Sequence, residues 1–398
     1  MFQVSEIEHR LATTSTFSDA DRKAPMPGPE DLTRYATHPE WAKTLGAVPR
    51  EHFIPDVAWA DPMGDAPSRM IDRDADPASW TSAVYDNTVI VTQIEDGRVP
   101  LTAENIDRTS EYTCSSSAPE NVASFLELLD PYPGDRVLEI GTGTGWTAAL
   151  LGRHVGDEGV VSVEVDEALA RQARANLERA GASVRVEVAD GAEGRPDGAP
   201  FDRVHVTCGV EDIPYAWIAQ TRPGGVVVLP WMPPSRGYKL RLTVLDDGTA
   251  QGRVHGECGY MMLRSQRSRG IDLADNEHES VPGVDPRRII RAGRGFEIAH
   301  VGLVPRTALS SWESADGGVL AILNDRTASH ALVRRSATGE LQVTQRGPRN
   351  LWDEAEQAFL TWTGWGEPRA DRFGVTVAPE GQHVWLDSPD NRIERVKN

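Results

Sequence analysis

The chain's most chemically informative stretch is a glutamate followed by three alternating glycines, EIGTGTG at positions 139–145. Glycines at 141, 143 and 145 let the backbone pass close to a ligand and point its amides at it. A dinucleotide-binding loop needs another glycine at the sixth motif position, where this chain has Trp146. The loop therefore predicts a site for an uncharged adenosine that carries an amino acid, rather than for a pyrophosphate.

Two further acids follow the loop at the spacing such a ligand requires. Glu164 ends the next expected strand and is placed to accept from both ribose hydroxyls. Asp190 follows the third strand and could take the adenine amino group, while Glu139 could accept from a ligand ammonium. This set predicts an S-adenosylmethionine site; its members are Glu139, Gly141, Thr142, Gly143, Gly145, Glu164, Val165, Asp190 and Gly191. The alternative is a tight turn beside two solvated carboxylates.

Short strands alternating with helices must position these residues. The pattern predicts strands at 136–140, 160–165, 183–188, 203–207 and 226–230, with helices at 146–153, 167–180 and 214–222. A hairpin is expected at 238–255, around the Asp246-Asp247-Gly248 turn. This rhythm predicts an α/β fold, a doubly wound parallel sheet with helices on both faces.

The regions on either side follow other patterns. Residues 1–112 are expected to form an N-terminal extension with an insertion, and 113–260 the cofactor-binding core. After about residue 270, antiparallel strands are expected at 318–323, 330–335 and 341–344, with a last hairpin over 373–386. Residues 270–398 are therefore predicted to be a separate α+β domain that recognises substrate.

Composition excludes several classes of protein. The formal charge of −19 argues against general binding to nucleic acid or to an anionic membrane surface. The three cysteines, Cys114, Cys208 and Cys258, are far apart, so neither a zinc site nor a disulfide framework is expected. The N-terminus has acids where a signal peptide needs an apolar run, which predicts a cytoplasmic protein. No resident metal is expected either.

Seven segments resemble motifs of the protein-L-isoaspartate O-methyltransferase family, within the class I methyltransferases, and they follow one another in the family's order. They are VPREHF (48–53), SSSAP (115–119), VLEIGTGTGW (137–146), VADG (188–191), APFD (199–202), DIP (212–214) and QTRPGG (220–225). The resemblance implies a Rossmann-like fold, S-adenosylmethionine as cofactor and a carboxylate acceptor in a peptide. By position it places Ser115, Ser116 and Ser117 in the acceptor loop, with Ser117 as the acceptor-site serine. Simple helix capping is the alternative role for Ser117.

The chain departs from the short family members in two places. About 50 residues are inserted after Pro62, and the chain continues well beyond the core. Such long forms resemble methyltransferases of graspetide, lanthipeptide and lasso-peptide pathways. The segments VTQ (91–93), YMMLR (260–264) and VWLDSPD (384–390) resemble the graspetide-associated group. That resemblance implies esterification of an aspartate side chain in a ribosomally made precursor peptide, either acidic or crosslinked, followed by aspartimide formation.

Two other functions remain open at this point. One is general repair of isoaspartyl proteins, and the other is a non-catalytic protein that only binds the cofactor or a peptide. Among the remaining candidate residues, His205 and Cys208 are expected to be packed rather than reactive. An arginine-rich stretch is expected to be a solvated face rather than a peptide site; it comprises Arg264, Arg267, Arg269, Arg287, Arg288, Arg291 and Arg294.

Overall fold

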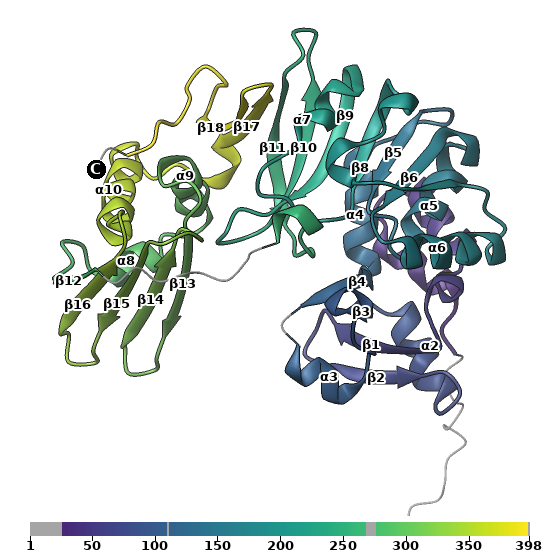
Figure 1. Ribbon diagram of the computed structural model, residues 1–398, viewed down its shortest axis with the longest axis horizontal. Coiled ribbons are helices and arrows are strands. Elements are labelled where there is room, and N and C mark those ends of the chain that lie inside the picture. The colour runs from purple at the N-terminus through teal and green to yellow at the C-terminus, as the bar shows by residue number, and fades with distance from the viewer. Residues whose placement is uncertain (1–25, 110, 268–275, 397–398) are drawn as a thin grey trace, which may run out of the picture.

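The structure, a computed structural model, describes residues 26–109, 111–267 and 276–396. Its elements form three sheets. Figure 1 shows a large central sheet, with a small N-terminal sheet below it and a C-terminal sheet to its left. Within these described ranges no helix is long and apolar enough to cross a bilayer.

The central sheet has nine strands in the order β18-β17-β11-β10-β9-β8-β5-β6-β7. Pairings among β5 to β9 are parallel and the others antiparallel. Its strands are β5 (Val137–Ile140), β6 (Val160–Glu164), β7 (Arg185–Val188), β8 (Phe201–Val206), β9 (Thr221–Trp231), β10 (Tyr238–Val244), β11 (Ala250–Glu257), β17 (Phe373–Ala378) and β18 (Gly381–Leu386). Its helices are α4 (Pro119–Leu129), α5 (Trp146–Val155), α6 (Glu167–Arg179) and α7 (Tyr215–Ala219).

Both faces of this sheet are buried, as the alternation of strands and helices predicts. Val137 and Val226 belong to one hydrophobic cluster, whereas their neighbours Leu138 and Val227 belong to the other. Adjacent strand residues point to opposite faces, so each face needs its own cover. The doubly wound α/β prediction is confirmed.

The N-terminal region builds an antiparallel sheet in the order β2-β1-β3-β4. Its elements are α1 (Pro39–Ala47), β1 (Val57–Pro62), β2 (Arg69–Asp72), α2 (Pro77–Tyr85), β3 (Thr88–Ile94), α3 (Ala103–Arg108) and β4 (Tyr112–Ser116). The insertion therefore supplies β2, α2, β3 and α3. Strand β4 runs directly into the serine loop. Residues 1–25 of this region lie outside the described ranges.

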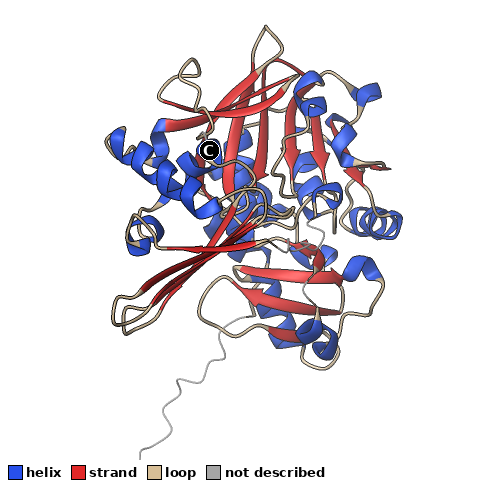
Figure 2. Ribbon diagram, turned by 60° about the vertical axis from the view of Figure 1, so that its left-hand side comes forward, coloured by secondary structure: helices blue, strands red, loops and turns tan. Residues whose placement is uncertain are grey.

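The C-terminal sheet has five antiparallel strands in the order β12-β16-β15-β14-β13. Its strands are β12 (Glu277–Ser280), β13 (Ala308–Glu313), β14 (Val319–Asn324), β15 (His330–Arg335) and β16 (Leu341–Arg346). Its helices are α8 (Pro286–Ile290), α9 (Arg294–Leu303) and α10 (Leu351–Gly364). Figure 2 shows the helices on one side of this sheet. The three strands expected between 318 and 344 are confirmed.

Short 3-10 turns complete the described structure. They are η1 (Pro29–Tyr35), η2 (Arg50–Phe53), η3 (Glu95–Gly97), η4 (Asp157–Gly159), η5 (Gly191–Glu193), η6 (Pro196–Gly198), η7 (Arg264–Gln266) and η8 (Ala370–Arg372).

The hairpin over 373–386 does not join the C-terminal sheet, and this corrects the sequence expectation. Strand β17 pairs with β11, with Gly252 opposite Val375, and so extends the central sheet. The pairing makes physical sense because all six residues of β17 are buried, so both of its faces are covered. The expected unit 270–398 is thus divided between two sheets.

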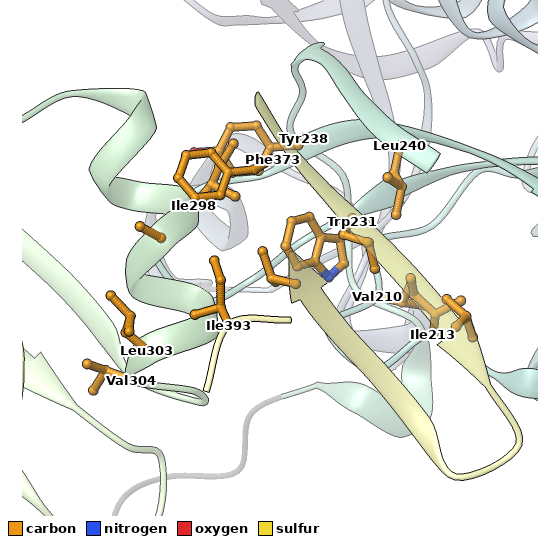
Figure 3. Packing of buried hydrophobic residues seen from close by; sticks show 14 of the residues in the cluster. Val210, Ile213, Trp231, Tyr238, Leu240, Ile298, Leu303, Val304, Phe373 and Ile393 are labelled. Carbon is orange, nitrogen blue, oxygen red and sulfur yellow. The ribbon is translucent and has the colours of Figure 1, made fainter. Parts of the chain in front are cut away.

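The same packing joins the C-terminal helices to the core. Figure 3 shows Ile298 and Leu303 of α9 beside Phe373, Trp231 and Ile393. All of these side chains belong to a single hydrophobic cluster that runs from β5 to α10. Residues 276–396 therefore share a core with the parallel sheet.

This shared core predicts cooperative unfolding. Phe373 is fully buried, so Phe373→Ala should lower the free energy of unfolding of the whole chain by about 3–5 kcal/mol. Urea titration followed by tryptophan fluorescence should still give a single transition. Leu360→Ala, at an exposed position on α10, is the control. Two transitions, of which only the one that reports on the C-terminal region is shifted by the substitution, would mean that this region folds independently.

Candidate active site

A cavity of about 990 Å³ lies at the carboxyl ends of β5 and β6, closed on one side by β4 and on another by residues 257–267. This is the position where open parallel sheets bind ligands. Of the predicted site residues, Glu139 and Gly145 do not line this cavity. The residues that do line it are Ser115, Ser116, Ser117, Gly141, Thr142, Gly143, Glu164, Val165, Asp190 and Gly191.

The glycine loop has the open backbone that its sequence predicts. Gly141 has φ +93°, and a Cβ there would lie 2.6 Å from the Thr207 hydroxyl oxygen. Gly143 has φ +54°, and its amide donates to Glu164 Oε2 at 2.9 Å. A side chain at either position would strain the loop. The loop therefore forms a cradle that only glycine allows.

Glu164 holds this cradle and is 7% exposed. Its second oxygen, Oε1, accepts from the Asp166 amide at 3.0 Å, so the carboxylate is fixed by two backbone amides. Each carboxylate oxygen has a further lone pair for a ligand hydroxyl. Asp190 is exposed at the cavity and accepts from the Ala192 amide at 2.9 Å. Both positions fit a nucleoside, although direct contact stays a prediction.

Glu139 is fully buried beneath the loop. Burial raises the pKa of its carboxyl to about 8. A hydrogen bond from the Ser162 hydroxyl at 2.5 Å lowers this pKa and so partly offsets the effect of burial. Its Oε1 has no hydrogen-bond partner among the described residues. A ligand ammonium would favour the ionised form. Glu139 is outside the cavity lining, so its direct contact with an ammonium also remains a prediction.

His205 faces this carboxyl with Nδ1 3.9 Å from Glu139 Oε1. Burial lowers the His205 pKa to about 3, so the imidazole is neutral at pH 7. Its ring packs edge-on against Phe125. Burial also raises the pKa of the Cys208 thiol to about 12, which leaves it protonated. Both residues are packed and unreactive, as expected.

The serine loop is fixed by Arg50, a residue whose role the sequence analysis missed. Arg50 Nε donates to Ser116 Oγ at 3.2 Å, and Nη2 donates to the carbonyls of Ser116 (3.0 Å) and Ser117 (2.9 Å). Burial lowers the Arg50 pKa to about 9, so it is still charged at pH 7. The Ser116 hydroxyl therefore holds the loop, while Ser115 and Ser117 remain available to a ligand.

Ser117 does not cap the following helix, so the capping alternative is wrong. Helix α4 begins at Pro119, and its N-cap is Ala118, without a side-chain capping bond. The Ser117 side chain instead lies beside the Tyr260 hydroxyl, where it lowers a Tyr260 pKa that burial raises. Tyr260 packs edge-on against Phe125, 5.3 Å between ring centroids, and lines the cavity. Tyr260 is thus, after Arg50, a second site residue to which the sequence analysis gave no role.

The cavity wall is held together by a cluster of ion pairs. Arg264 lies 3.1 Å from Asp96 and 3.2 Å from Asp166, joining the insertion to the helix that follows Glu164. Arg267 pairs with Asp96 at 2.8 Å and with Glu111 at 3.0 Å. We call this cluster of two arginines and three acids the clasp.

The clasp removes Arg264 and Arg267 from the solvated face expected for the arginine-rich stretch, whereas Arg288, Arg291 and Arg294 are exposed, as expected. Arg264 and Arg267 are engaged within the protein, and so are Arg287 with Asp285, Arg291 with Glu313 and Arg294 with Glu257. Arg288 lies over the Phe359 ring. Arg269 lies outside the described residues. No group of three or more metal-ligating side chains occurs in the part of the chain that the structure describes.

The nucleoside cradle, the acceptor loop beside it and the doubly wound sheet define a class I S-adenosylmethionine-dependent methyltransferase. A family profile described as Protein-L-isoaspartate(D-aspartate) O-methyltransferase matches residues 100–268. The protein-L-isoaspartate O-methyltransferase of Methylorubrum extorquens is 33% identical over 231 residues, which cover 58% of this chain and 81% of that protein. The chain belongs to the protein-L-isoaspartate O-methyltransferase family, whose members are carboxyl methyltransferases that use S-adenosylmethionine.

Two further comparisons define the extent of the likeness. The enzyme of that name from Methanopyrus kandleri is 41% identical over 150 residues, 37% of this chain and 66% of that protein. A solved structure of a protein-L-isoaspartate O-methyltransferase covers 90% of this chain and 98% of its own, with a TM-score of 0.52 and 23% identity. That structure matches in fold well beyond the core.

Removing the Glu164 carboxylate should weaken cofactor binding. Charge-assisted hydrogen bonds contribute about 1.5–3 kcal/mol each, so Glu164→Ala should lower S-adenosylmethionine affinity by roughly 10- to 150-fold in calorimetry. Glu167→Ala is the control, because this exposed acid forms its one ion pair among the described residues with Arg171 on the same helix. An unchanged affinity in Glu164→Ala would remove the residue from the site.

Ser117→Ala should separate catalysis from stability. Since Ser117 caps no helix, the melting temperature of the variant should fall only by the small effect of losing the contact with Tyr260. Turnover should fall roughly tenfold or more through loss of acceptor alignment. Cofactor affinity should not change. Ser82→Ala, at an exposed position on α2 and outside the cavity, is the control. Normal turnover in Ser117→Ala would contradict the assignment.

Proposed function

We propose that this protein methylates the side-chain carboxylate of an aspartate in a ribosomally made peptide, and that it acts on a restricted set of sequences. The observation that carries the proposal is the composition of the cavity wall. Besides core residues, the wall includes Met63 and Tyr112 at the two ends of the insertion, and Arg264 and Arg267 of the clasp. An acceptor peptide entering this cavity would meet surfaces beyond those that hold the cofactor.

The reaction requires little of the protein beyond aligning the acceptor carboxylate with the methyl group. S-adenosylmethionine supplies an electrophilic methyl group on a sulfonium. A carboxylate is ionised at pH 7 and is already nucleophilic, so no general base is needed. Ser117 and Tyr260 can orient one acceptor oxygen, and the glycine cradle with Glu164 holds the other reactant. The carboxylate oxygen–carbon bond forms as the sulfur–carbon bond breaks, which leaves a methyl ester and S-adenosylhomocysteine.

The same ester would lead to the second step of the proposal. The amide nitrogen of the residue after the aspartate loses its proton and attacks the ester carbonyl, and methanol leaves. The product is an aspartimide, one water lighter than the starting peptide. This step is intramolecular and needs no further group from the protein.

A restricted substrate range follows from the choice of acceptor. Ordinary aspartate occurs in nearly every protein, so an enzyme that esterifies it must recognise additional features of its substrate. Binding energy from those features can also help to position the carboxylate. The insertion, fixed across the cavity by the clasp, supplies such a surface.

General repair of isoaspartyl proteins is the second candidate, and the comparisons favour it. Each relative reported above carries the isoaspartate name, and one solved structure of that name shares the fold over most of the chain. The C-terminal region therefore does not by itself distinguish maturation from repair. The two functions differ in whether an isoaspartyl residue alone suffices for recognition.

The two candidates predict opposite substrate preferences. The full-length enzyme with S-adenosylmethionine would be given two short synthetic peptides that differ only in L-isoaspartate or L-aspartate, and any short acidic peptide found to be encoded next to its gene. We expect efficient methylation of an encoded peptide and subsequent loss of methanol in mass spectrometry. Activity on the short isoaspartyl peptide should be lower in kcat/KM by roughly tenfold or more. Efficient methylation of arbitrary isoaspartyl peptides would establish repair instead.

A further inference from the structure

The C-terminal sheet leaves one of its faces and one of its edges uncovered. Helix α10 packs on the face that carries Val319, Ala321 and Val333, which are buried. Figure 2 shows the helices on this side only. The opposite face contains a groove of about 940 Å³, which Trp312, Leu320, Arg334 and Gln342 line together. These four residues form one row across β13, β14, β15 and β16.

The side chains of this row are unusual for a solvent-facing surface. Trp312 is 57% exposed. The Arg334 side chain forms no ion pair or hydrogen bond within the described part of the chain, whereas the side chains of Arg335 and Arg346 pair with Asp285 and Glu277. Exposed tryptophan and arginine are the residue types that most often dominate binding energy at interfaces. An unpaired cation beside Leu320, with the Trp312 ring on the other side of Leu320, would suit a partner with both apolar and acidic side chains.

The edge next to this row is also open to pairing. Strand β13 is a terminal strand of its sheet, and its last four residues are all exposed. The Leu309 amide points away from β14 and donates to Ser235 Oγ at 3.0 Å. Because alternate residues of a strand share an edge, the backbone groups of Ser311 and Glu313 point outward as well.

The two edges of the sheet differ in how they are protected. The opposite edge, β12, is short and charged, with the sequence Glu-His-Glu-Ser, which discourages pairing. Strand β13 has no such protection before Glu313. An unprotected edge strand is a template for an added strand, and many peptides are recognised in this way.

This edge begins close to the active site. Ser235, which accepts from the Leu309 amide, precedes Arg236, and Arg236 pairs with Glu257 at 3.0 Å. Glu257 lines the cofactor cavity. At about 3.4 Å per residue, Trp312 is about 10 Å along the strand from Leu309. One extended peptide could therefore contact the groove with one segment while another enters the cavity.

We propose that β13 and the adjoining groove bind an extended segment of the substrate peptide outside the methylated residue. The segment would pair with the β13 edge, place an apolar side chain on Trp312 and Leu320, and direct a carboxylate to Arg334. This inference rests on the proposed function, because it supplies the additional recognition that an aspartate-specific enzyme needs.

The test uses the full-length protein and two short fluorescein-labelled peptides, one alternating leucine with glutamate and the other leucine with lysine. In fluorescence anisotropy the glutamate peptide should bind, and the lysine peptide should bind at least tenfold more weakly. Trp312→Ser should weaken binding of the glutamate peptide by roughly tenfold or more. Arg334→Glu should reverse the preference between the two peptides. Leu360→Ser and Arg369→Glu, at exposed positions outside the groove, are the controls and should bind as the wild type does.

Several outcomes would overturn the inference. They are no binding of the glutamate peptide up to about 1 mM, equal binding of both peptides, or binding that neither groove substitution changes. A dimer in sedimentation that Trp312→Ser dissociates would show that a second copy of the chain occupies this face instead. Cofactor affinity should be normal in both groove variants. If the wild type binds the glutamate peptide but methylates no aspartyl peptide, the proposed function fails while the docking site stands.

Discussion

A buried guanidinium that has no carboxylate partner among the described residues organises this active site. Arg50 is completely buried, and each of its nitrogens donates to the protein: Nε to a hydroxyl, and Nη1 and Nη2 to carbonyl groups. Burying a charge is costly unless its hydrogen bonds are satisfied, and here backbone and hydroxyl oxygens satisfy them. The charge therefore fixes the positions of several backbone segments at once, since moving any of them would leave a donor unpaired.

Those segments are the ones that the reaction must bring together. Arg50 contacts the carbonyls of Val84 and Thr88, at the end of α2 and the start of β3, and those of Ser116 and Ser117 in the acceptor loop. Its guanidinium also lies 5.1 Å from the ring centroid of Trp146, the first residue after the glycine loop. The Trp146 indole nitrogen donates to the Val48 carbonyl at 3.3 Å. The segment around Arg50 thus sets the distance between the acceptor loop and the cofactor cradle.

The sequence predicted the parts of this arrangement that depend on local pattern. Alternating strands and helices identified the doubly wound sheet, and the glycine spacing identified the cradle with Glu164 beside it. The pairing of β17 with β11 could not be predicted, because it joins residues more than a hundred positions apart and leaves no local signal. The role of Arg50 was hidden for a related reason: its partners are mostly backbone carbonyls, which every residue type has. The clasp was missed because Arg264 and Arg267 have their acids in distant segments.

The central claim is that Arg50 positions the serine loop for methyl transfer, and Arg50→Lys tests it most directly. Lysine keeps the charge but cannot donate to all of these acceptors from one plane. At a temperature where circular dichroism shows the variant folded, single-turnover methyl transfer to the substrate identified for the wild type would be compared with calorimetric affinity for S-adenosylmethionine. The account predicts a transfer rate at least tenfold lower, with cofactor affinity within about threefold of the wild type. A folded Arg50→Lys enzyme that transfers methyl groups at the wild-type rate would contradict it.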